Sequence, residues 1–245
     1  RPPRSTPKPS SAASDVYKRQ AMIKAITCIK RKLGMGVEDF QTYWRGKHAD
    51  VVAELPKIHR YVQSHALLGG YRRGELAYDG IAEIWVESVD VLRAWAGSAE
   101  YQAVELDENN FINRSKTALI LTLEHVIKDG PFPDNALKNI EFVPRKPGMP
   151  VDEFQAYWRN VHGPIAAEID VIRRYVQSHT LPGAYRDGRL PPIDGCAITW
   201  FDNIDSMRQS AKSAAYDRTR MDEANFIDVS KEIPFIITNE HVIVA

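Results

Sequence analysis

The sequence has few cysteines, no excess of either charge and no long apolar run. Its 245 residues include two cysteines, and 32 Lys and Arg residues balance 32 Asp and Glu residues. Two cysteines are too few for a disulfide framework or a thiolate zinc site, and they suit a reducing compartment. The charge balance leaves no basic surface for nucleic acid, and no apolar stretch approaches the roughly 20 residues that cross a bilayer. We therefore expect a cytoplasmic protein with no nucleic-acid or membrane partner.

The amino-terminal segment differs from the rest of the chain. Residues 1–20 are rich in proline, serine and basic residues, and they show neither helical nor strand periodicity. This composition predicts a disordered tail, and the absence of a central apolar run argues against a signal peptide. Residues 11–20 resemble translated adaptor sequence, so we expect the tail to be non-native and Met22 to be the natural start.

The remaining sequence contains one pattern twice. The segment FQTYWR at residues 40–45 recurs as FQAYWR at 154–159, and RYVQSH at 60–65 recurs unchanged at 174–179, both 114 residues later. Later matches shift to an offset of 115, as for Trp85 and Trp200. Such constant offsets indicate a duplicated domain. We place repeat one at residues 21–130 and repeat two at 131–245.

Each repeat has the order strand, helix, strand, strand, helix, strand. Hydrophobic periodicity predicts strands near 23–30, 58–68, 81–87 and 116–127, and helices over 37–55 and 89–113. In repeat two it predicts strands near 137–143, 172–181, 196–201 and 233–244, and helices near 151–169 and 204–228. This order is the ferredoxin-like βαββαβ unit, an antiparallel sheet with both helices on one face. Because the other face needs cover, we predict an α+β fold in which the two repeats pack as a pseudo-dimeric α/β barrel around a cavity.

Several motifs resemble the EthD domain. In repeat one they are KRKLGM at 30–35, EDF at 38–40, YWR at 43–45 and RYVQSH at 60–65. Repeat two has RKPGM at 145–149, DEF at 152–154, YWR at 157–159 and HGP at 162–164. The resemblance covers residues 22–244 and implies the dimeric α/β-barrel group. That group includes polyketide cyclases, muconolactone isomerases, cofactor-free monooxygenases, fungal dehydratases and decarboxylases, and haem enzymes, so it implies a fold more closely than a reaction.

Histidines at matched positions are the first candidate catalytic groups. His48 and His162 follow the helix tryptophan by one turn, and His65 and His179 lie on the second strand of each repeat. Histidine is suited to proton transfer near neutral pH, so we name all four as candidate catalytic residues. Pro164 would kink the helix and turn His162 toward a cavity. The alternative is that these are buried core histidines, matched only because the two halves share an origin.

One face of the second strand is polar. Tyr61, Gln63 and His65 alternate onto the same face of this strand in repeat one. The matched side chains in repeat two are Tyr175, Gln177 and His179. We predict that this face lines the cavity, with Tyr61 and Tyr175 as catalytic residues and Gln63 and Gln177 as substrate-binding residues. The alternative is a satisfied polar network between the two sheets.

The remaining substrate-binding candidates are Trp44, Trp158, Glu83, Glu141 and Asn139. We assign Ile26 and Ile140 to the helix-facing side of the first strand of each repeat, so Asn139 and Glu141 should point into the barrel. Burial of either carboxylate would raise its pKa and make it a usable acid or base. The alternatives are solvated edge positions for the two acids and core packing for the two tryptophans.

These candidates predict a cofactor-independent lyase, isomerase or cyclase. It would act by proton transfer, decarboxylation or dehydration on a small aromatic, polyketide-like or lactone substrate. We expect no metal, because no histidine pair has the helical spacing of a zinc site. We expect no cofactor, with haem as the alternative, since one histidine is enough for axial ligation. The rival functions are a cofactor-free monooxygenase and a non-catalytic accessory or small-molecule-binding protein of a degradation pathway. The fused unit is also a candidate homodimer.

Overall fold

The computed structural model describes residues 22–245, so the tail predicted at 1–20 lies outside the described residues. The strands of repeat one are β1 (Ile23–Ile29), β2 (Arg60–Ala66), β3 (Gly80–Val86) and β4 (Ala118–Asp129). Its α-helices are α2 (Val37–Tyr43), α3 (Ala49–Ala53), α4 (Val89–Trp95) and α5 (Ala99–Glu108). The strands of repeat two are β5 (Leu137–Val143), β6 (Arg174–Thr180), β7 (Gly195–Phe201) and β8 (Phe235–Val244). Its α-helices are α6 (Val151–Tyr157), α7 (Gly163–Ala167), α8 (Ile204–Ser210) and α9 (Ala214–Glu223).

The predicted helices are interrupted at specific places. A π-helical turn, η1 (Trp44–His48), joins α2 to α3, and a second, η4 (Trp158–His162), joins α6 to α7. A π turn inserts one extra residue into a helix, and both turns end on the matched histidine. The helix predicted over 89–113 is instead two helices. Gly97 separates them with φ +83°, a conformation that favours glycine.

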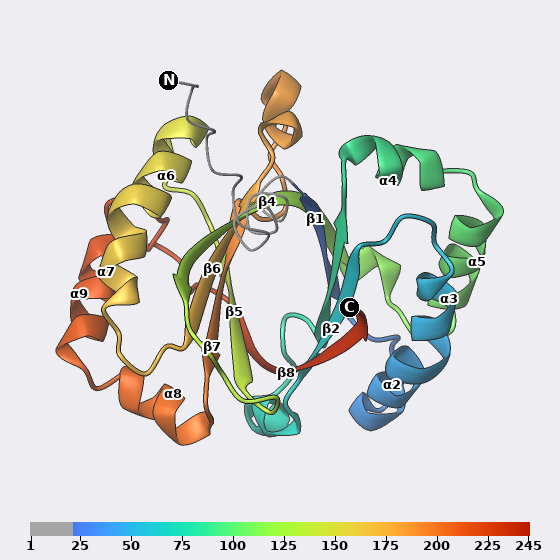
Figure 1. Cartoon of the computed structure of the whole chain (residues 1–245), viewed down its shortest axis with the longest axis horizontal. Coiled ribbons are helices and arrows are strands. Elements are labelled where there is room, and N and C mark those ends of the chain that lie inside the picture. Colours follow the sequence, from blue (N-terminus) through green and yellow to red (C-terminus); the bar gives the residue numbers. More distant parts are fainter. Residues whose placement is uncertain (1–21) are drawn as a thin grey trace, which may run out of the picture.

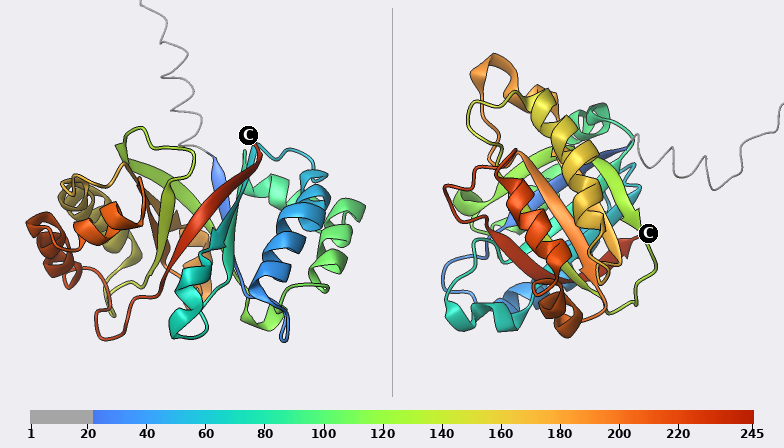
Figure 2. Two further views of the ribbon diagram at one scale, coloured as in Figure 1. Left: turned by 90° about the horizontal axis from the view of Figure 1, so that it is seen from below. Right: turned by 90° about the vertical axis from the view of Figure 1, so that its left-hand side faces the viewer.

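The strands close into one barrel in the order β1-β3-β2-β8-β5-β7-β6-β4. All neighbouring strands are antiparallel, and the repeats join where β2 pairs with β8 and β4 pairs with β6. Figure 1 shows the helices of the two repeats on opposite sides of the barrel, and β8 leaving its own helices to end beside β2. Figure 2 shows the same helical layers flanking the barrel from two further directions. The predicted pseudo-dimeric α/β barrel of two ferredoxin-like repeats is therefore confirmed. None of the helices between residues 22 and 245 has the length and apolar character needed to cross a bilayer.

Side chains fill the interior of the barrel. Ile26, Ile140 and Ile198 are fully buried members of its apolar cluster. In the same interior, Lys24 on β1 and Lys138 on β5, both 1% exposed, contact one buried carboxylate, that of Glu83 on β3. The second carboxylate partners of these lysines are Glu124 and Glu240, each at 2.8–2.9 Å. The space between the two sheets is a packed and ion-paired core.

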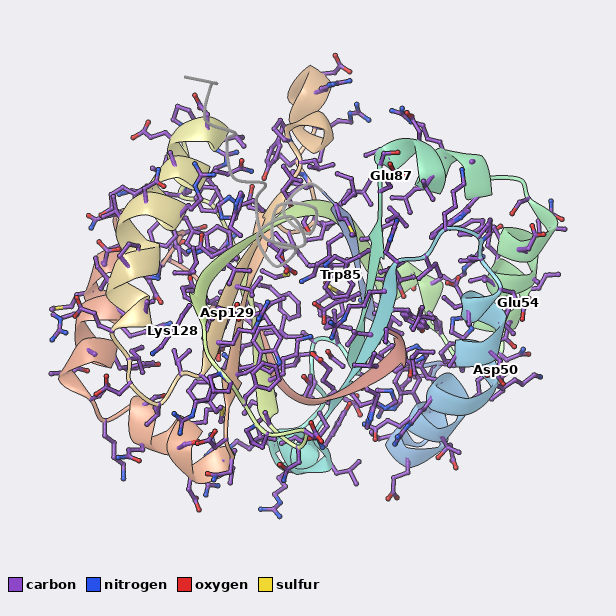
Figure 3. All side chains as sticks on the ribbon, viewed as in Figure 1. Asp50, Glu54, Trp85, Glu87, Lys128 and Asp129 are labelled. Carbon is purple, nitrogen blue, oxygen red and sulfur yellow. The ribbon has the colours of Figure 1, made fainter. Side chains whose placement is uncertain are left out.

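Figure 3 shows which side of the sheet several labelled side chains take. Trp85 on β3 points toward the middle of the barrel, and Lys24 Nζ lies 4.8 Å from the centre of its ring. Asp50 on α3 and Glu54, which directly follows α3, lie on the far side of the sheet. The outer faces of the sheet are therefore the ones that the helices cover.

The predicted direction of the polar strand face is wrong. Tyr61, Gln63 and His65 face the helices of repeat one: Gln63 Nε2 donates to the Trp44 carbonyl at 2.9 Å, and His65 stacks on the Trp44 ring at 4.5 Å. The assignment of Ile26 to the helix-facing side is wrong for the same reason. Alternation along a strand fixes which side chains share a face, but not which face the helices cover.

The matched assignments in repeat two are also reversed. Ile140 belongs to the barrel core, so Asn139 and Glu141 point outward, under the helices. Gln177 Nε2 donates to the Trp158 carbonyl at 2.9 Å, and His179 stacks on the Trp158 ring at 4.5 Å. Of the two carboxylates predicted to lie inside the barrel, only Glu83 does.

Candidate functional site

A cavity of about 500 Å³ lies in repeat two, between the outer face of the sheet and the helices. Strands β5 and β6 supply Asn139, Glu141 and Tyr175 to its floor, and α9 supplies Arg220 and Glu223 to its wall. Its apolar lining includes Ile169, Ile172, Phe201 and Met207. The lining thus combines apolar and polar side chains, and a hollow of this size is large enough for a small molecule.

One position that borders the cavity carries a large side chain in repeat one and a small one in repeat two. Trp95 ends α4, is 5% exposed and donates its indole N–H to the Pro56 carbonyl at 2.9 Å. The matched residue 115 positions later is Ser210, at the end of α8, whose hydroxyl donates to the Met207 carbonyl at 2.6 Å. Replacing an indole by a hydroxymethyl group leaves the hollow that Ser210 lines. The cavity is therefore a feature of repeat two, and Trp95 fills the matching space in repeat one.

His162 is held in the cavity wall by an acid on the neighbouring helix. The turn η4 directs it toward α9, where its Nδ1 lies 2.8 Å from Asp222 Oδ2. Asp222 also accepts a hydrogen bond from the Tyr157 hydroxyl at 2.8 Å. Burial lowers the pKa of His162, although Asp222 opposes the shift. The neutral ring therefore donates from Nδ1 to Asp222 and keeps the lone pair on Nε2, an assignment that follows from the hydrogen-bond network. Nε2 is a base without a partner among residues 22–245.

Two carboxyl groups of the cavity retain protons unusually well. Burial raises the pKa of Glu223 to about 7, and the charge of Glu141 contributes to the rise. The Arg220 guanidinium, 2.8 Å away, acts in the opposite direction and lowers this pKa. Burial also raises the pKa of Glu141, against Arg220 and a hydrogen bond from Asn139. Two like charges in one buried site disfavour double ionisation, so this pair holds a proton near neutral pH. A protonated carboxyl can donate to a ligand.

The hydroxyl proton of Tyr175 is available for a hydrogen bond to a ligand. Its oxygen accepts from Gln177 Nε2 at 3.0 Å and from Trp158 Nε1 at 3.2 Å. Burial raises the pKa of Tyr175, so the phenol stays protonated. With both acceptor positions used, the remaining O–H is free to donate to an oxygen in the cavity that Tyr175 lines.

The structure brings four of the predicted site residues together. Those that line the cavity are His162, Tyr175, Asn139 and Glu141. His179 lies behind them, with Nε2 2.9 Å from Gln177 Oε1, and burial lowers the pKa of His179 to about 2. Such a ring stays neutral and fixes Gln177, which in turn fixes Tyr175. His179, Gln177 and Trp158 are therefore positioned to support Tyr175 rather than to contact a ligand.

The predicted residues of repeat one do not line this cavity. His48 Nδ1 lies 2.7 Å from Asp107 Oδ2, and His65 Nε2 lies 2.9 Å from Gln63 Oε1. The matched residues of repeat two make the same contacts. Burial lowers the pKa of His65 to about 3. Tyr61 and Trp44 belong to the same packed cluster as Trp95. The histidine–aspartate pair therefore occurs in both repeats, and the pair of repeat two is the one whose histidine lines the cavity.

Sequence reasoning missed Glu223, Arg220, Ser210 and Tyr216, which also line the cavity. The signal that could have found them is a difference between the repeats. Arg220 replaces Glu105 and Ser210 replaces Trp95 at an offset of 115. Where one repeat has a core tryptophan and the other has serine, the second repeat has less side-chain volume to fill the same place.

The lining of the cavity can be compared with what a metal ion or haem requires. Among residues 22–245, no group of three or more His, Cys, Asp or Glu side chains is arranged to hold a metal ion. Haem needs an imidazole beside a broad apolar slot. His162 offers the imidazole, but the floor beside it presents Asn139, Glu141 and the Tyr175 hydroxyl. These groups do not fit a porphyrin face.

Comparisons with solved structures give the same architecture. An anthrone oxidase-like protein has a TM-score of 0.64 and 9% identity, covering 92% of this chain and 94% of its own. A proposed monooxygenase from Lactobacillus acidophilus has a TM-score of 0.55 and 11% identity, covering 91% and 95%. A proposed chlorite dismutase has a TM-score of 0.53 and 10% identity, covering 90% and 95%. At these sequence identities the similarity shows a shared fold and nothing more.

The family comparison is more specific. No curated protein matches the chain. The profile of the EthD domain matches it twice, at residues 32–115 and 146–230. These two matches cover most of the chain and coincide with the two repeats of the barrel. The chain therefore belongs to the EthD family and carries the EthD domain in tandem.

Proposed function

We propose that the cavity of repeat two is the active site of a cofactor-independent lyase or isomerase acting on a small aromatic or polyketide-like ketone. The observation that carries this proposal is the convergence of a neutral imidazole, a phenol and a proton-holding carboxyl pair on one hollow. A base and an acid that are both usable near neutral pH are what enolisation and dehydration require.

The proposed reaction begins at carbon. His162 Nε2 removes the proton next to a ketone, and the C–H electron pair moves to form an enolate. The Tyr175 hydroxyl donates a hydrogen bond to the enolate oxygen, and Asp222 stabilises the imidazolium. For a β-hydroxy ketone, the enolate expels the hydroxyl group, which leaves as water with the proton of Glu223. Transfer of the proton from His162 through solvent to Glu223 restores both groups.

The lining supports this substrate class. The aliphatic and aromatic residues Ile169, Phe201 and Met207 provide a surface for fused rings. Asn139 Oδ1 is buried without a donor within residues 22–245, so it can accept a hydrogen bond from a substrate hydroxyl. The anthrone oxidase-like fold neighbour and the polyketide enzymes of the barrel group agree with a multi-ring hydroxyketone.

The test is turnover of bicyclic and tricyclic β-hydroxy ketones, measured as loss of water by mass spectrometry. We expect His162→Gln to lower kcat by about 10²–10⁴-fold, the usual contribution of a general base. The matched control is His48→Gln, which should leave kcat within about twofold because His48 does not line the cavity of repeat two. Equal losses in both variants, with both folded, would refute the assignment of the site.

A second candidate is cofactor-free oxygenation of a phenol in the same cavity. It is favoured by the neutral base, because removal of a phenolic proton by His162 gives an electron-rich ring that can react with oxygen. Oxygen consumption that requires His162 would select this reaction over dehydration. Saturable binding with neither water loss nor oxygen uptake would instead favour a non-catalytic accessory or binding protein.

A further inference from the structure

A second cleft lies at the other side of the sheet, where β8 extends beyond β5. β5 begins opposite Asn239, so within the described chain the end of β8 from Glu240 onward pairs with β2 alone. A cleft of about 440 Å³ occupies this place, between β8 and the segment that joins the repeats. Trp200 on β7, Arg60 on β2 and Phe132 of the joining segment line it.

Two buried donors of this cleft have no acceptor within residues 22–245. Trp200 is 6% exposed, and its indole Nε1 makes no hydrogen bond. The Nε of Arg60 is also buried and unpaired. Buried N–H groups are rarely left without a partner. Two unsatisfied donors in one hollow indicate a ligand that brings acceptor atoms.

Comparison of the repeats shows which acceptor is missing. Arg174, the twin of Arg60, is ion-paired with Asp129 on β4. The position that matches Asp129 is Ala245, 116 residues later and directly after β8. Arg60 therefore has no such partner, and its one carboxylate neighbour, Glu240, lies 3.5 Å away. Glu240 is itself bound by Lys138 at 2.8 Å.

The cleft also offers a flat apolar surface. The rings of Trp200 and Phe132 stack with centroids 5.7 Å apart and planes 23° apart. Arg45 and His241 add donors at the rim, whereas Asp134 adds one acid. Lys138 is shared between Glu240 and Glu83, so the feature that favours an acceptor-bearing ligand is the pair of unsatisfied donors, Trp200 Nε1 and Arg60 Nε.

We propose that this cleft binds a small planar carboxylic acid. Its carboxylate pairs with Arg60, in the place that Asp129 takes at Arg174, and accepts the indole N–H of Trp200. Its ring lies along the stacked Trp200 and Phe132. Planar, charge-assisted hydrogen bonding of this kind is what a guanidinium provides best. The cleft is separate from the cavity of repeat two, so the proposal does not depend on the proposed reaction.

The test is calorimetric titration of the whole protein with benzoate, together with ¹⁵N NMR of the indole N–H groups. We expect saturable binding and a shift of the Trp200 N–H signal, which is assigned by its loss in Trp200→Phe. Arg60→Gln should weaken binding at least about tenfold, the effect of losing a charge-assisted pair. The control Arg114→Gln, at an arginine that is ion-paired with Glu105 and Glu108 and does not line the cleft, should change the affinity less than about twofold.

Three further measurements keep the result unambiguous. Benzamide, which has the same ring and no charge, should bind at least about tenfold more weakly than benzoate. Benzoate should still bind to Ser210→Trp, because that substitution fills only the cavity of repeat two. Thermal unfolding shows that each variant is folded, and Arg60→Gln alone decides the matter if Trp200→Phe does not fold. Equal binding of benzamide, equal affinity of Arg60→Gln, or no saturable benzoate binding would overturn the proposal.

Discussion

Trp95 and Ser210 occupy the same position in the two repeats, and the indole of one fills the space that the hydroxymethyl group of the other leaves open. Trp95 packs in the apolar cluster between sheet and helices of repeat one, whereas Ser210 lines the cavity of repeat two. The two halves therefore share a topology but differ in packing at this position: an indole fills it in repeat one, and a cavity borders it in repeat two.

Filling the cavity should abolish turnover without unfolding the barrel. We expect Ser210→Trp to place an indole where Trp95 lies in repeat one, and so to lower kcat/KM by at least about 100-fold through exclusion of substrate. The measurement is turnover together with thermal unfolding. Ser210→Ala, which leaves the hollow open, is the matched control, and full activity in Ser210→Trp would contradict the role of the cavity.

Emptying the matching place in repeat one should cost stability instead. Trp95→Ser removes a buried indole and its hydrogen bond to Pro56, so we expect a loss of about 3–5 kcal/mol in the free energy of unfolding. Urea unfolding of Trp95→Ser and wild type measures this difference. Turnover at a temperature where both are folded should stay unchanged, and a drop in kcat would show that repeat one takes part in the chemistry.

The raised pKa of Glu223 should make stability fall with rising pH. Its pKa is about 7 in the folded protein against 4.5 for the free side chain, so folding favours the protonated form. The stabilisation is complete below about pH 4.5 and is lost as pH rises to about 7, a change of about 2–3 kcal/mol. Glu223→Gln should flatten this part of the stability curve measured by urea unfolding. An unchanged slope would show that another group titrates.

Activity should follow the same group. If Glu223 delivers its proton to the leaving hydroxyl, kcat falls above about pH 7 as Glu223 ionises. In Glu223→Gln the amide cannot deliver a proton, so we expect a lower kcat that no longer falls in this range. The pH profile of kcat for both proteins is the measurement, and a decline above pH 7 that persists in the variant would assign the titration elsewhere.

The buried ion pairs of the barrel predict the opposite pH dependence. Burial opposes ionisation of Glu83, but Lys138 and Lys24 hold its pKa down at about 2. Its contribution is present above the free value of 4.5 and is lost as pH falls through about 2. We expect Glu83→Gln to lower the free energy of unfolding by about 3–5 kcal/mol at pH 7, because both lysines lose a partner. Acid and urea unfolding should show the difference shrinking toward pH 2, and a constant difference would contradict the ion-pair explanation.

The fold could be predicted because hydrophobic residues follow strand and helix periods, and because the same pattern occurs twice in the sequence. The identical segments around Tyr61 and Tyr175 fixed the offset between the repeats, and strand and helix periods then gave the order of elements. The local breaks could not be predicted, since a π turn after Trp44 or Trp158 preserves the helical pattern on both sides.

The site could be predicted only in part. His162, Tyr175, Asn139 and Glu141 were found as candidates, but with the strand faces reversed. Gln63 and Gln177 lie buried under helices because each reaches a helix carbonyl, and that partner is distant in sequence. The cavity lies where Ser210 replaces the packed Trp95. This difference between the repeats points to a cavity only when it is known that the helices cover the outer faces of the sheet.

The single acid between Lys24 and Lys138 bears on the history of the chain. Ile198 stands where a second copy of Glu83 would lie, and the Ser178 hydroxyl, twin of the Ser64 hydroxyl that contacts Glu83, has no partner within residues 22–245. A twofold-symmetric ancestor would have carried either two such acids or none. Because one acid contacts lysines from both halves, neither half can be exchanged for a copy of the other without losing or duplicating that acid.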